Sequence, residues 1–266
     1  MMKNFIMLSG MPRSGSQVLS SMLNQHPEIY STTTSPVADL LGVVGEQWPV
    51  ISQALTDTHP DQFTNMLTGL VDGAYKHIDK TTIVDKNRLW PRYSELTKHM
   101  LGQRPKIICT VRNIPDILAS YILLIEKNNH KITYIDQDLI DSKLPINNKN
   151  RCRVLWEKYM THPYTSLRIG VNSGNADMLF VNYEDIVGNG QATVNRICDF
   201  IGVDHYLLDV NNLQRMDEND SYHGGLEGLH DVRQTLKKSS PDPQQVIGRE
   251  LTNLYKSMSL EFWRKL

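Results

Sequence analysis

Residues 9–16 read Ser-Gly-Met-Pro-Arg-Ser-Gly-Ser and stand between an apolar run and a segment with helical periodicity. The run from Phe5 to Leu8 predicts a short buried strand. The residues from about Gly15 to Asn24 carry apolar side chains at helical spacing, which predicts a helix. A strand, a glycine-containing loop and a helix form the basic unit of an α/β sheet, whose ligands bind where the strands end. The quoted loop is therefore a candidate binding loop.

The rest of the chain alternates between strand and helix patterns. Further strands are expected at residues 81–84, 106–111 and 178–182. Helices are expected at about 36–55, 61–77, 151–160, 164–171 and 192–201, from near Pro115 and from about Gln244. This alternation predicts an α/β fold with a mainly parallel sheet flanked by helices, and residues 1–266 are expected to form a single domain.

Two segments lack regular periodicity. Residues 127–150 are polar, and we expect them to form an excursion that could cover the site instead of joining the core. Residues 216–238 contain glycines together with His223 and His230, a composition that suits a loop near a ligand.

Charge and composition exclude several classes of protein. The 28 basic and 29 acidic side chains give a net charge of −1, and no run of like charges indicates a tail that binds nucleic acid. The sequence has no apolar stretch of the ~18 residues needed for a membrane span. Cys109, Cys152 and Cys198 are far apart, which indicates neither a disulfide framework nor a zinc site and fits a cytoplasmic location. The oligomeric state is left open.

The first candidate anion site is the loop from Gly10 to Gly15. It has the two glycines of a Walker loop, but Ser16 stands in place of the lysine and Gln17 in place of the serine or threonine. Backbone N–H groups and a helix N-terminus can still bind a phosphate there. Without the usual Lys and Mg²⁺ ligand, metal-driven ATP hydrolysis is not expected, and Arg13 could supply the missing charge. A tight strand-to-helix turn without a ligand is the alternative.

A second anion site is predicted after the strand at 106–111. That strand brings Arg112 to the carboxyl edge of the sheet, and Ser120 follows eight residues later, about two helical turns on if the helix begins near Pro115. Both side chains could face one phosphate. Taken alone, the arginine could instead pair with a surface carboxylate and the serine could face solvent.

Several motifs together resemble one enzyme family. GMPRSGS resembles the 5′-phosphosulfate loop of sulfotransferases, and VRNIPDILAS at 111–120 resembles their 3′-phosphate segment. The motifs similar to the bacterial branch also include Thr-Ser-Pro at 34–36, DKNR at 85–88, Tyr-Glu-Asp at 183–185 and GLHDVR at 228–233. This resemblance implies a P-loop NTPase-like three-layer sandwich of the sulfotransferase type.

The resemblance also implies a reaction and its donor. In the family, 3′-phosphoadenosine-5′-phosphosulfate (PAPS) gives its sulfuryl group to an acceptor hydroxyl or amine and leaves as 3′,5′-ADP, without a metal. The residues implied to bind the donor are Arg13, Ser14, Gly15, Ser16, Gln17, Arg112, Ser120 and Tyr183, the last near the adenine. The acceptor carries no recognisable signature.

Two cations are candidates for catalysis. Arg13 and Lys86 are implied to stabilise the charge that develops on the bridging oxygen between phosphate and sulfate. Lys86 matches a strand-end lysine of tyrosylprotein sulfotransferases, although it could also be a solvated surface charge.

The general base of the reaction is not supplied by the matching motifs. Tyrosylprotein sulfotransferases have a glutamate where this chain has Thr33 and Thr34, and cytosolic enzymes have a histidine where it has Arg88. Asp85, at a strand end, is the best remaining carboxylate, although it could instead orient the neighbouring lysine. The alternatives are His223 and His230, His130 in the polar excursion, or the substrate itself, whereas His26 is expected to be structural.

Two other functions stay open on the sequence. A P-loop kinase-like nucleotide enzyme would need its lysine from elsewhere in the chain, and the missing Walker residues argue against it. A nucleotide-binding module that has lost catalysis is the second alternative, because the base is unassigned.

Overall fold

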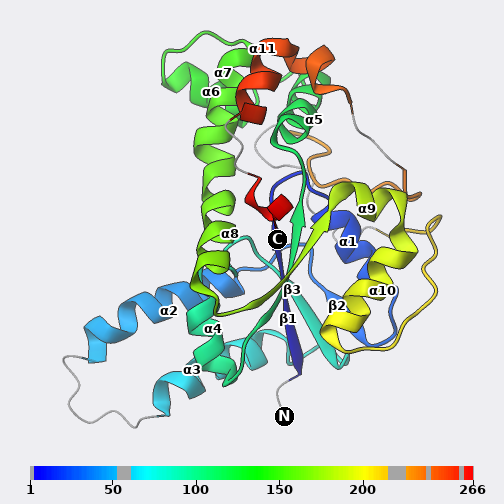
Figure 1. Ribbon diagram of the computed structural model, residues 1–266. Helices are drawn as coiled ribbons and strands as arrows, with labels where there is room; N and C mark the ends of the chain where they lie inside the picture. Colours follow the sequence, from blue (N-terminus) through cyan, green and yellow to red (C-terminus); the bar gives the residue numbers. More distant parts are fainter. Residues whose placement is uncertain (1–2, 53–60, 215–225, 238–240, 258–260, 266) are drawn as a thin grey trace.

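Five strands form one sheet in the computed structural model, which describes residues 3–52, 61–214, 226–237, 241–257 and 261–265 (Figure 1). The strands are β1 (Asn4–Gly10), β2 (Ile29–Ser31), β3 (Thr82–Lys86), β4 (Lys106–Val111) and β5 (Asp177–Asn182). Their order is β2-β3-β1-β4-β5, and every neighbouring pair is parallel. From β1 the chain first forms β2 and β3 on one side and then β4 and β5 on the other. A topological switch point therefore lies between β1 and β4.

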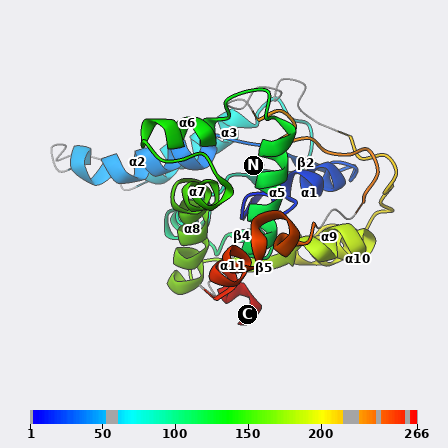
Figure 2. The same cartoon turned by 90° about the horizontal axis from the view of Figure 1, so that it is seen from above.

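Both faces of the sheet are covered, because successive side chains of β1 point to opposite sides. Ile6 and Leu8 pack on the face covered by α1 (Ser16–Leu23), α9 (Tyr183–Gly188) and α10 (Gly190–Ile201). Phe5 and Met7 belong to a larger cluster on the other face. Its helices are α2 (Val37–Ser52), α3 (Gln62–Ala74), α4 (Ser94–Leu101), α5 (Ile114–Lys127), α6 (Tyr134–Asp141), α7 (Asn148–Val154), α8 (Thr161–Ser173) and α11 (Pro243–Ser257). Figure 2 shows the layers from above. The predicted α/β fold with a parallel sheet between helices is confirmed.

Two elements carry no clear signal in the sequence. β2 has only three residues, too few for an alternating pattern to stand out. α4 has eight residues and buries Ser94 and Thr97 beside Met100, and its apolar side chains at Leu96, Met100 and Leu101 make only a short stripe. Both elements are therefore too short for the sequence pattern to mark them.

Residues 148–173 form one continuous helical path, whereas the sequence pattern predicts two separate helices. α7 leads into a π-helical turn, η1 (Leu155–Met160), and then into α8. Pro163 has no N–H to donate and its ring crowds the carbonyl one turn earlier. The wider π turn accommodates the proline, and Thr161 Oγ1 donates to the Trp156 carbonyl at 2.8 Å.

The polar segment 127–150 contains helix α6. Thr133 caps this helix by accepting from the Asp136 N–H, and Asp136 is paired with Arg151 at 2.7 Å. Ile135 and Leu139 are fully buried in the main core. The expectation that the segment stays outside the core was therefore wrong, because two apolar residues one turn apart are enough to anchor a short helix.

Helices α2 and α3 form a pair that extends from the body, at the lower left of Figure 1. Trp48 stacks on Phe63 with ring centroids 5.0 Å apart and joins the two helices. Among the helices of the described ranges, none combines the length and the apolar character needed to cross a bilayer.

Candidate active site

The predicted site residues follow the carboxyl ends of four neighbouring strands. The register pairs Leu8 with Lys86, Gly10 with Thr110 and Val111 with Asn182. The loop after β1, the end of β3, Arg112 after β4 and Tyr183 after β5 therefore meet at one edge of the sheet. They line a pocket of about 160 Å³.

The two loop glycines are required by close approaches. A Cβ on Gly10 would lie 2.2 Å from the Thr110 carbonyl oxygen on β4. Gly15 caps helix α1 with a φ of 90°, and a Cβ there would lie 3.1 Å from the Tyr183 ring. Side chains at either position would push the loop away from its neighbours. The glycines thus bring the N-terminus of α1, with its unpaired first-turn N–H groups, to the pocket.

Ser14 points into the protein and not into the pocket. Its hydroxyl is fully buried and lies 2.7 Å from Thr110 Oγ1 and 3.0 Å from the Thr110 carbonyl oxygen. Ser16 and Gln17, by contrast, line the pocket. Ser14 therefore fixes the loop on β4, and only its backbone is available to a ligand.

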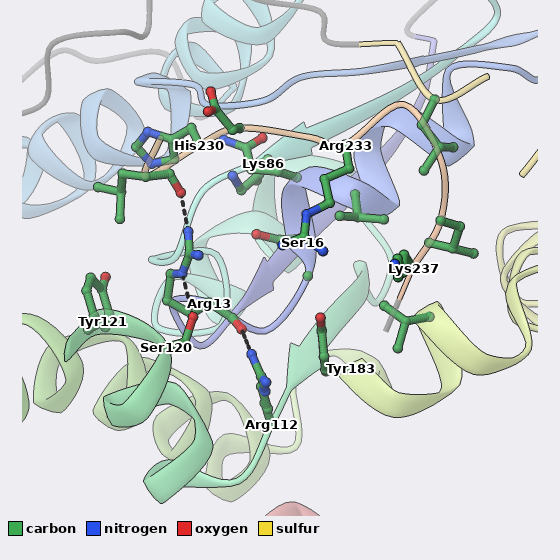
Figure 3. A pocket seen from close by; sticks show the side chains of 18 of the residues that line it. Arg13, Ser16, Lys86, Arg112, Ser120, Tyr121, Tyr183, His230, Arg233 and Lys237 are labelled. Atoms are coloured by element: carbon green, nitrogen blue, oxygen red, sulfur yellow. Dashed lines mark hydrogen bonds between the residues drawn. The ribbon is translucent and has the colours of Figure 1, made fainter. Parts of the chain in front are cut away.

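Arg13 connects the two predicted anion sites (Figure 3). Its Nε donates to Ser120 Oγ at 3.2 Å, and its own carbonyl accepts from Arg112 Nη1 at 3.2 Å. Its Nη1 donates to the Leu229 carbonyl. Arg13 has a φ of 57°, an uncommon conformation for a side-chain-bearing residue. Burial lowers the pKa of its guanidinium, so a bound anion would relieve an unfavourably desolvated charge.

Arg112 is buried against an aromatic ring. Only 3% of the residue is exposed, and its guanidinium carbon lies 4.0 Å from the centre of the Tyr183 ring. Burial lowers the pKa of the Arg112 guanidinium, an effect that the nearby Tyr183 opposes. Both residues and Ser120 line the pocket. The structure therefore brings together the two residues of the second predicted anion site.

Lys86 lies on the same pocket beside the loop. Its Nζ donates to the Thr33 carbonyl at 2.6 Å, and its backbone N–H donates to Thr32 Oγ1. With the Gln17 amide turned to suit its neighbours, the amide oxygen accepts from Lys86 Nζ at 3.2 Å. The ammonium group is thus held next to the first turn of α1, and it is not a freely solvated charge.

Asp85 is not among the residues that line the pocket. It is fully buried, accepts from Trp90 Nε1 at 2.7 Å and accepts a short hydrogen bond from the Tyr75 hydroxyl. Tyr75 in turn lies 3.2 Å from Ser35 Oγ. Burial raises the pKa of the Asp85 carboxyl. This position does not fit the expected direct contact with an acceptor, because the carboxylate faces the core beneath Lys86.

The histidines considered from the sequence fall in different places. His230 lines the pocket. His26 is buried, accepts from the Glu28 N–H and lies 3.0 Å from the Asp204 carbonyl oxygen, as a structural residue would. His130 is exposed and does not line the pocket. His223 lies outside the described residues.

Three further cations line the pocket that were not assigned a role from the sequence: Arg88, Arg233 and Lys237. Within the described part of the chain, no ion pair joins them to a carboxylate. Arg233 and Lys237 belong to residues 226–237, which form neither helix nor strand and cross the pocket. The sequence signal that could have marked Arg233 and Lys237 as site residues was the presence of basic side chains in an irregular, glycine-containing segment.

The model of the sulfotransferase family matches residues 5–206, about three quarters of the chain. The chain belongs to the sulfotransferase family. The matched range includes the loop after β1, Lys86, Arg112, Ser120 and Tyr183, whereas the segment 226–237 of this sulfotransferase lies beyond it. No curated protein matches the sequence.

Solved structures with a similar fold are also sulfotransferases. One is mouse sulfotransferase SULT7A1 complexed with PAP, with 15% identity, a TM-score of 0.49 and coverage of 96% of this chain and 88% of the mouse chain. A sulfotransferase from Alicyclobacillus acidocaldarius has 14% identity, a TM-score of 0.46 and coverage of 96% and 92%. A sulfotransferase domain from the curacin biosynthetic pathway has 16% identity, a TM-score of 0.45 and coverage of 95% and 90%.

Proposed function

We propose that this sulfotransferase moves a sulfuryl group from PAPS to an acceptor hydroxyl or amine and releases 3′,5′-ADP. The observation that supports this best is the position of Arg13, which contacts Ser120 and Arg112 from within the loop after β1. Two anion sites that are about a hundred residues apart in sequence therefore share one pocket. A nucleotide with phosphates at both its 5′ and 3′ ends fits such a pair.

The donor would be held by groups of different kinds. Backbone N–H groups of residues 14–17 and the N-terminus of α1 would bind the 5′-phosphosulfate, together with the Ser16 and Gln17 side chains. Arg112 and Ser120 would bind the 3′-phosphate, and Tyr183 would lie near the adenine. We add Arg233 and Lys237 as donor contacts, because both line the pocket without a carboxylate partner in the described chain.

Arg13 and Lys86 would stabilise the transition state. As the bond from sulfur to the bridging oxygen breaks, negative charge develops on the 5′-phosphate side. Both cations lie at the loop where that phosphate would bind, and both are already oriented by hydrogen bonds. Because these cations are already oriented, little reorganisation energy is needed as the charge develops. No metal therefore needs to take part.

We propose a positioning role for Asp85. Its hydrogen bonds to Tyr75 and Trp90 fix the end of β3, directly before Lys86. The carboxyl would therefore act through the backbone that carries the lysine, not by touching the acceptor.

We also propose a cytoplasmic location. Cys109, Cys152 and Cys198 are free and buried, as expected of thiols in a protein that works in a reducing compartment.

Ligand-dependent thermal stability tests the proposed donor. 3′,5′-ADP should raise the melting temperature by mass action, without dependence on Mg²⁺, and 5′-ADP should have a much smaller effect at the same concentration. A larger shift with Mg-ATP would indicate a kinase-like enzyme instead. Binding of 3′,5′-ADP without any sulfuryl transfer from PAPS would indicate a module that has lost catalysis.

A further inference from the structure

Helix α2, which extends from the body in Figure 1, is apolar on its outer face as well as on the face that packs. Gly42 and Gly45 let the inner face approach its neighbours, because a Cβ at Gly42 would collide with the Tyr93 ring and one at Gly45 would lie 2.7 Å from Leu96. The side chains on the opposite face are between 49% and 64% exposed: Leu40, Val43, Val50 and Ile51. They recur at helical spacing and form one row, the outer strip of α2. Since a helix usually carries polar residues on its solvent face, this strip suggests a ligand.

The outer strip begins beside the pocket that would hold the donor. Lys86, which lines that pocket, donates from Nζ to the Thr33 carbonyl at 2.6 Å. The next residue, Asn87, donates from Nδ2 to Asp39 Oδ2 at 2.6 Å. Asp39 lies in the first turn of α2 and directly precedes Leu40. An acceptor whose reacting group lies near Lys86 can therefore place the rest of its length along α2.

The size and charge of the outer strip fit a small apolar ligand better than a protein or a membrane. Its exposed side chains present on the order of 400 Å² of apolar surface, the size of patches that mark functional sites on monomers. A stable protein interface buries about 800 Å² on each partner, roughly twice that area. Helix α2 contains no lysine or arginine and carries Asp39 and Glu46, so an anionic membrane would not attract it.

The shape and chemistry of the outer strip favour an alkyl chain. Leu40 and Val50 lie about 15 Å apart along the helix axis, and the row between them is aliphatic except for Gln47. A sugar would need several polar partners, and a phenol would need a flat surface to stack on. The nearby Trp48 ring is already stacked on Phe63. A long, narrow row of aliphatic side chains therefore suits a flexible hydrocarbon.

We propose that the acceptor is a hydroxyl on an unbranched alkyl chain and that the chain lies on the outer strip of α2, an inference that rests on the proposed function. The hydroxyl oxygen forms a bond to sulfur while the bond from sulfur to the bridging oxygen breaks. The electron pair of the broken bond leaves on 3′,5′-ADP, and the hydroxyl proton goes to solvent water. The second product is an alkyl sulfate.

NMR of methyl groups tests where the chain lies without any turnover. Saturating 3′,5′-ADP occupies the donor site, and hexanol, octanol and decanol are then titrated as probes. The methyl signals of Leu40, Val43 and Val50 should shift to saturation. The dissociation constant should fall about two- to fourfold for each added methylene. The methyl signals of Leu254, which is 48% exposed on α11, should not shift.

Val43→Gln places an amide in the middle of the outer strip and should weaken decanol binding about fivefold. Because Val43 is exposed, the melting temperature and the affinity for 3′,5′-ADP should stay close to the wild type. Leu254→Gln is the matched control and should bind decanol normally. In assays of PAPS turnover, Val43→Gln should raise the KM for decanol and leave kcat unchanged, since the chain binds equally in the ground state and the transition state.

The outcomes separate the two proposals. If 3′,5′-ADP does not bind to the wild type, the proposed function fails. If it binds but the alcohols leave the α2 methyl signals unchanged, or longer chains bind no better, the alkyl acceptor is overturned. Binding of the alcohols without any alkyl sulfate as product overturns it as well. Dimers in analytical ultracentrifugation, or binding to phosphatidylcholine vesicles, would assign the strip to a second copy or to a lipid surface instead if Val43→Gln abolished them.

Discussion

The guanidinium carbon of Arg112 lies 4.0 Å from the centre of the Tyr183 ring. Arg112 follows β4 and Tyr183 follows β5, and the pairing of Val111 with Asn182 in these strands brings the two residues together. The ring orients the planar guanidinium and shields it from water, which strengthens its attraction for a phosphate. This contact links the predicted 3′-phosphate site to the predicted adenine site.

Tyr183→Leu should therefore weaken 3′,5′-ADP binding about tenfold, because a cation–π contact worth ~1 kcal/mol and a flat surface for the adenine are both lost. Tyr183→Phe keeps the ring and should stay within about threefold of the wild type. Calorimetry measures both affinities. Equal losses in the two variants would mean that the hydroxyl, and not the ring, is the important group.

Arg112→Ala should weaken 3′,5′-ADP binding at least about 100-fold, because a buried, charge-assisted contact to a phosphate is removed. Arg112→Lys should recover only part of this loss, since an ammonium lacks the planar fork and would stack less well on Tyr183. Arg249→Ala, at an exposed position on α11, is the control and should bind normally. Wild-type affinity in Arg112→Ala would remove this residue from the donor site.

Arg233→Ala and Lys237→Ala should each weaken 3′,5′-ADP binding about three- to tenfold, with a smaller dependence of affinity on salt than in the wild type. Both side chains are exposed, so their attraction for the donor is screened by ions. Titrations at low and high ionic strength measure this effect. An unchanged salt dependence would show that these side chains do not face the nucleotide.

Gly10→Ala should destabilise the protein by about 2–4 kcal/mol, because its Cβ would collide with the Thr110 carbonyl and its φ of 141° is strained for any other residue. Gly69→Ala is the matched control, since a Cβ there meets no atom within 4 Å and the residue lies inside helix α3. It should be neutral or stabilise by ~0.5–1 kcal/mol. Urea denaturation measures both changes, and similar stabilities would show that the loop can relax.

Asp85→Asn should become more stable relative to the wild type as the pH rises. The folded-state pKa of this carboxyl is raised by burial, so its favourable contribution is present below the unfolded pKa of about 4 and is lost as the pH rises through the folded value. Asparagine does not ionise and avoids this loss. Urea denaturation between pH 4 and pH 8 gives the difference in the free energy of unfolding. A difference that does not depend on pH would mean that Asp85 is not held in its neutral form.

Asp85→Ala separates the structural role from the charge. It leaves the Tyr75 hydroxyl and Trp90 Nε1 without their shared acceptor, which should cost about 2–4 kcal/mol of stability at any pH. Asp85→Asn should retain most of the wild-type turnover. A large loss of turnover with normal donor affinity and normal pH dependence of stability would return Asp85 to the role of a base.

Local sequence determined the parts of this protein that depend on short-range geometry. Gly10 and Gly15 mark the loop because only glycine allows the close approach and the left-handed cap found there. The buried strand at 106–111 and the position of Arg112 after it follow from an apolar run and its end. The α/β architecture follows from such alternation, since parallel strands need helical crossovers.

Tertiary structure alone decided which side chains face the pocket. Ser14 and Ser16 are two positions apart in one loop, yet Ser14 is bonded to β4 and only Ser16 lines the pocket. Asp85 and Lys86 are neighbours, but strand alternation sends the carboxylate into the core and leaves the lysine at the site. His230 reaches the same pocket from beyond the family match through the bond between Arg13 and Leu229. Such contacts join residues far apart in the chain, and no local pattern records them.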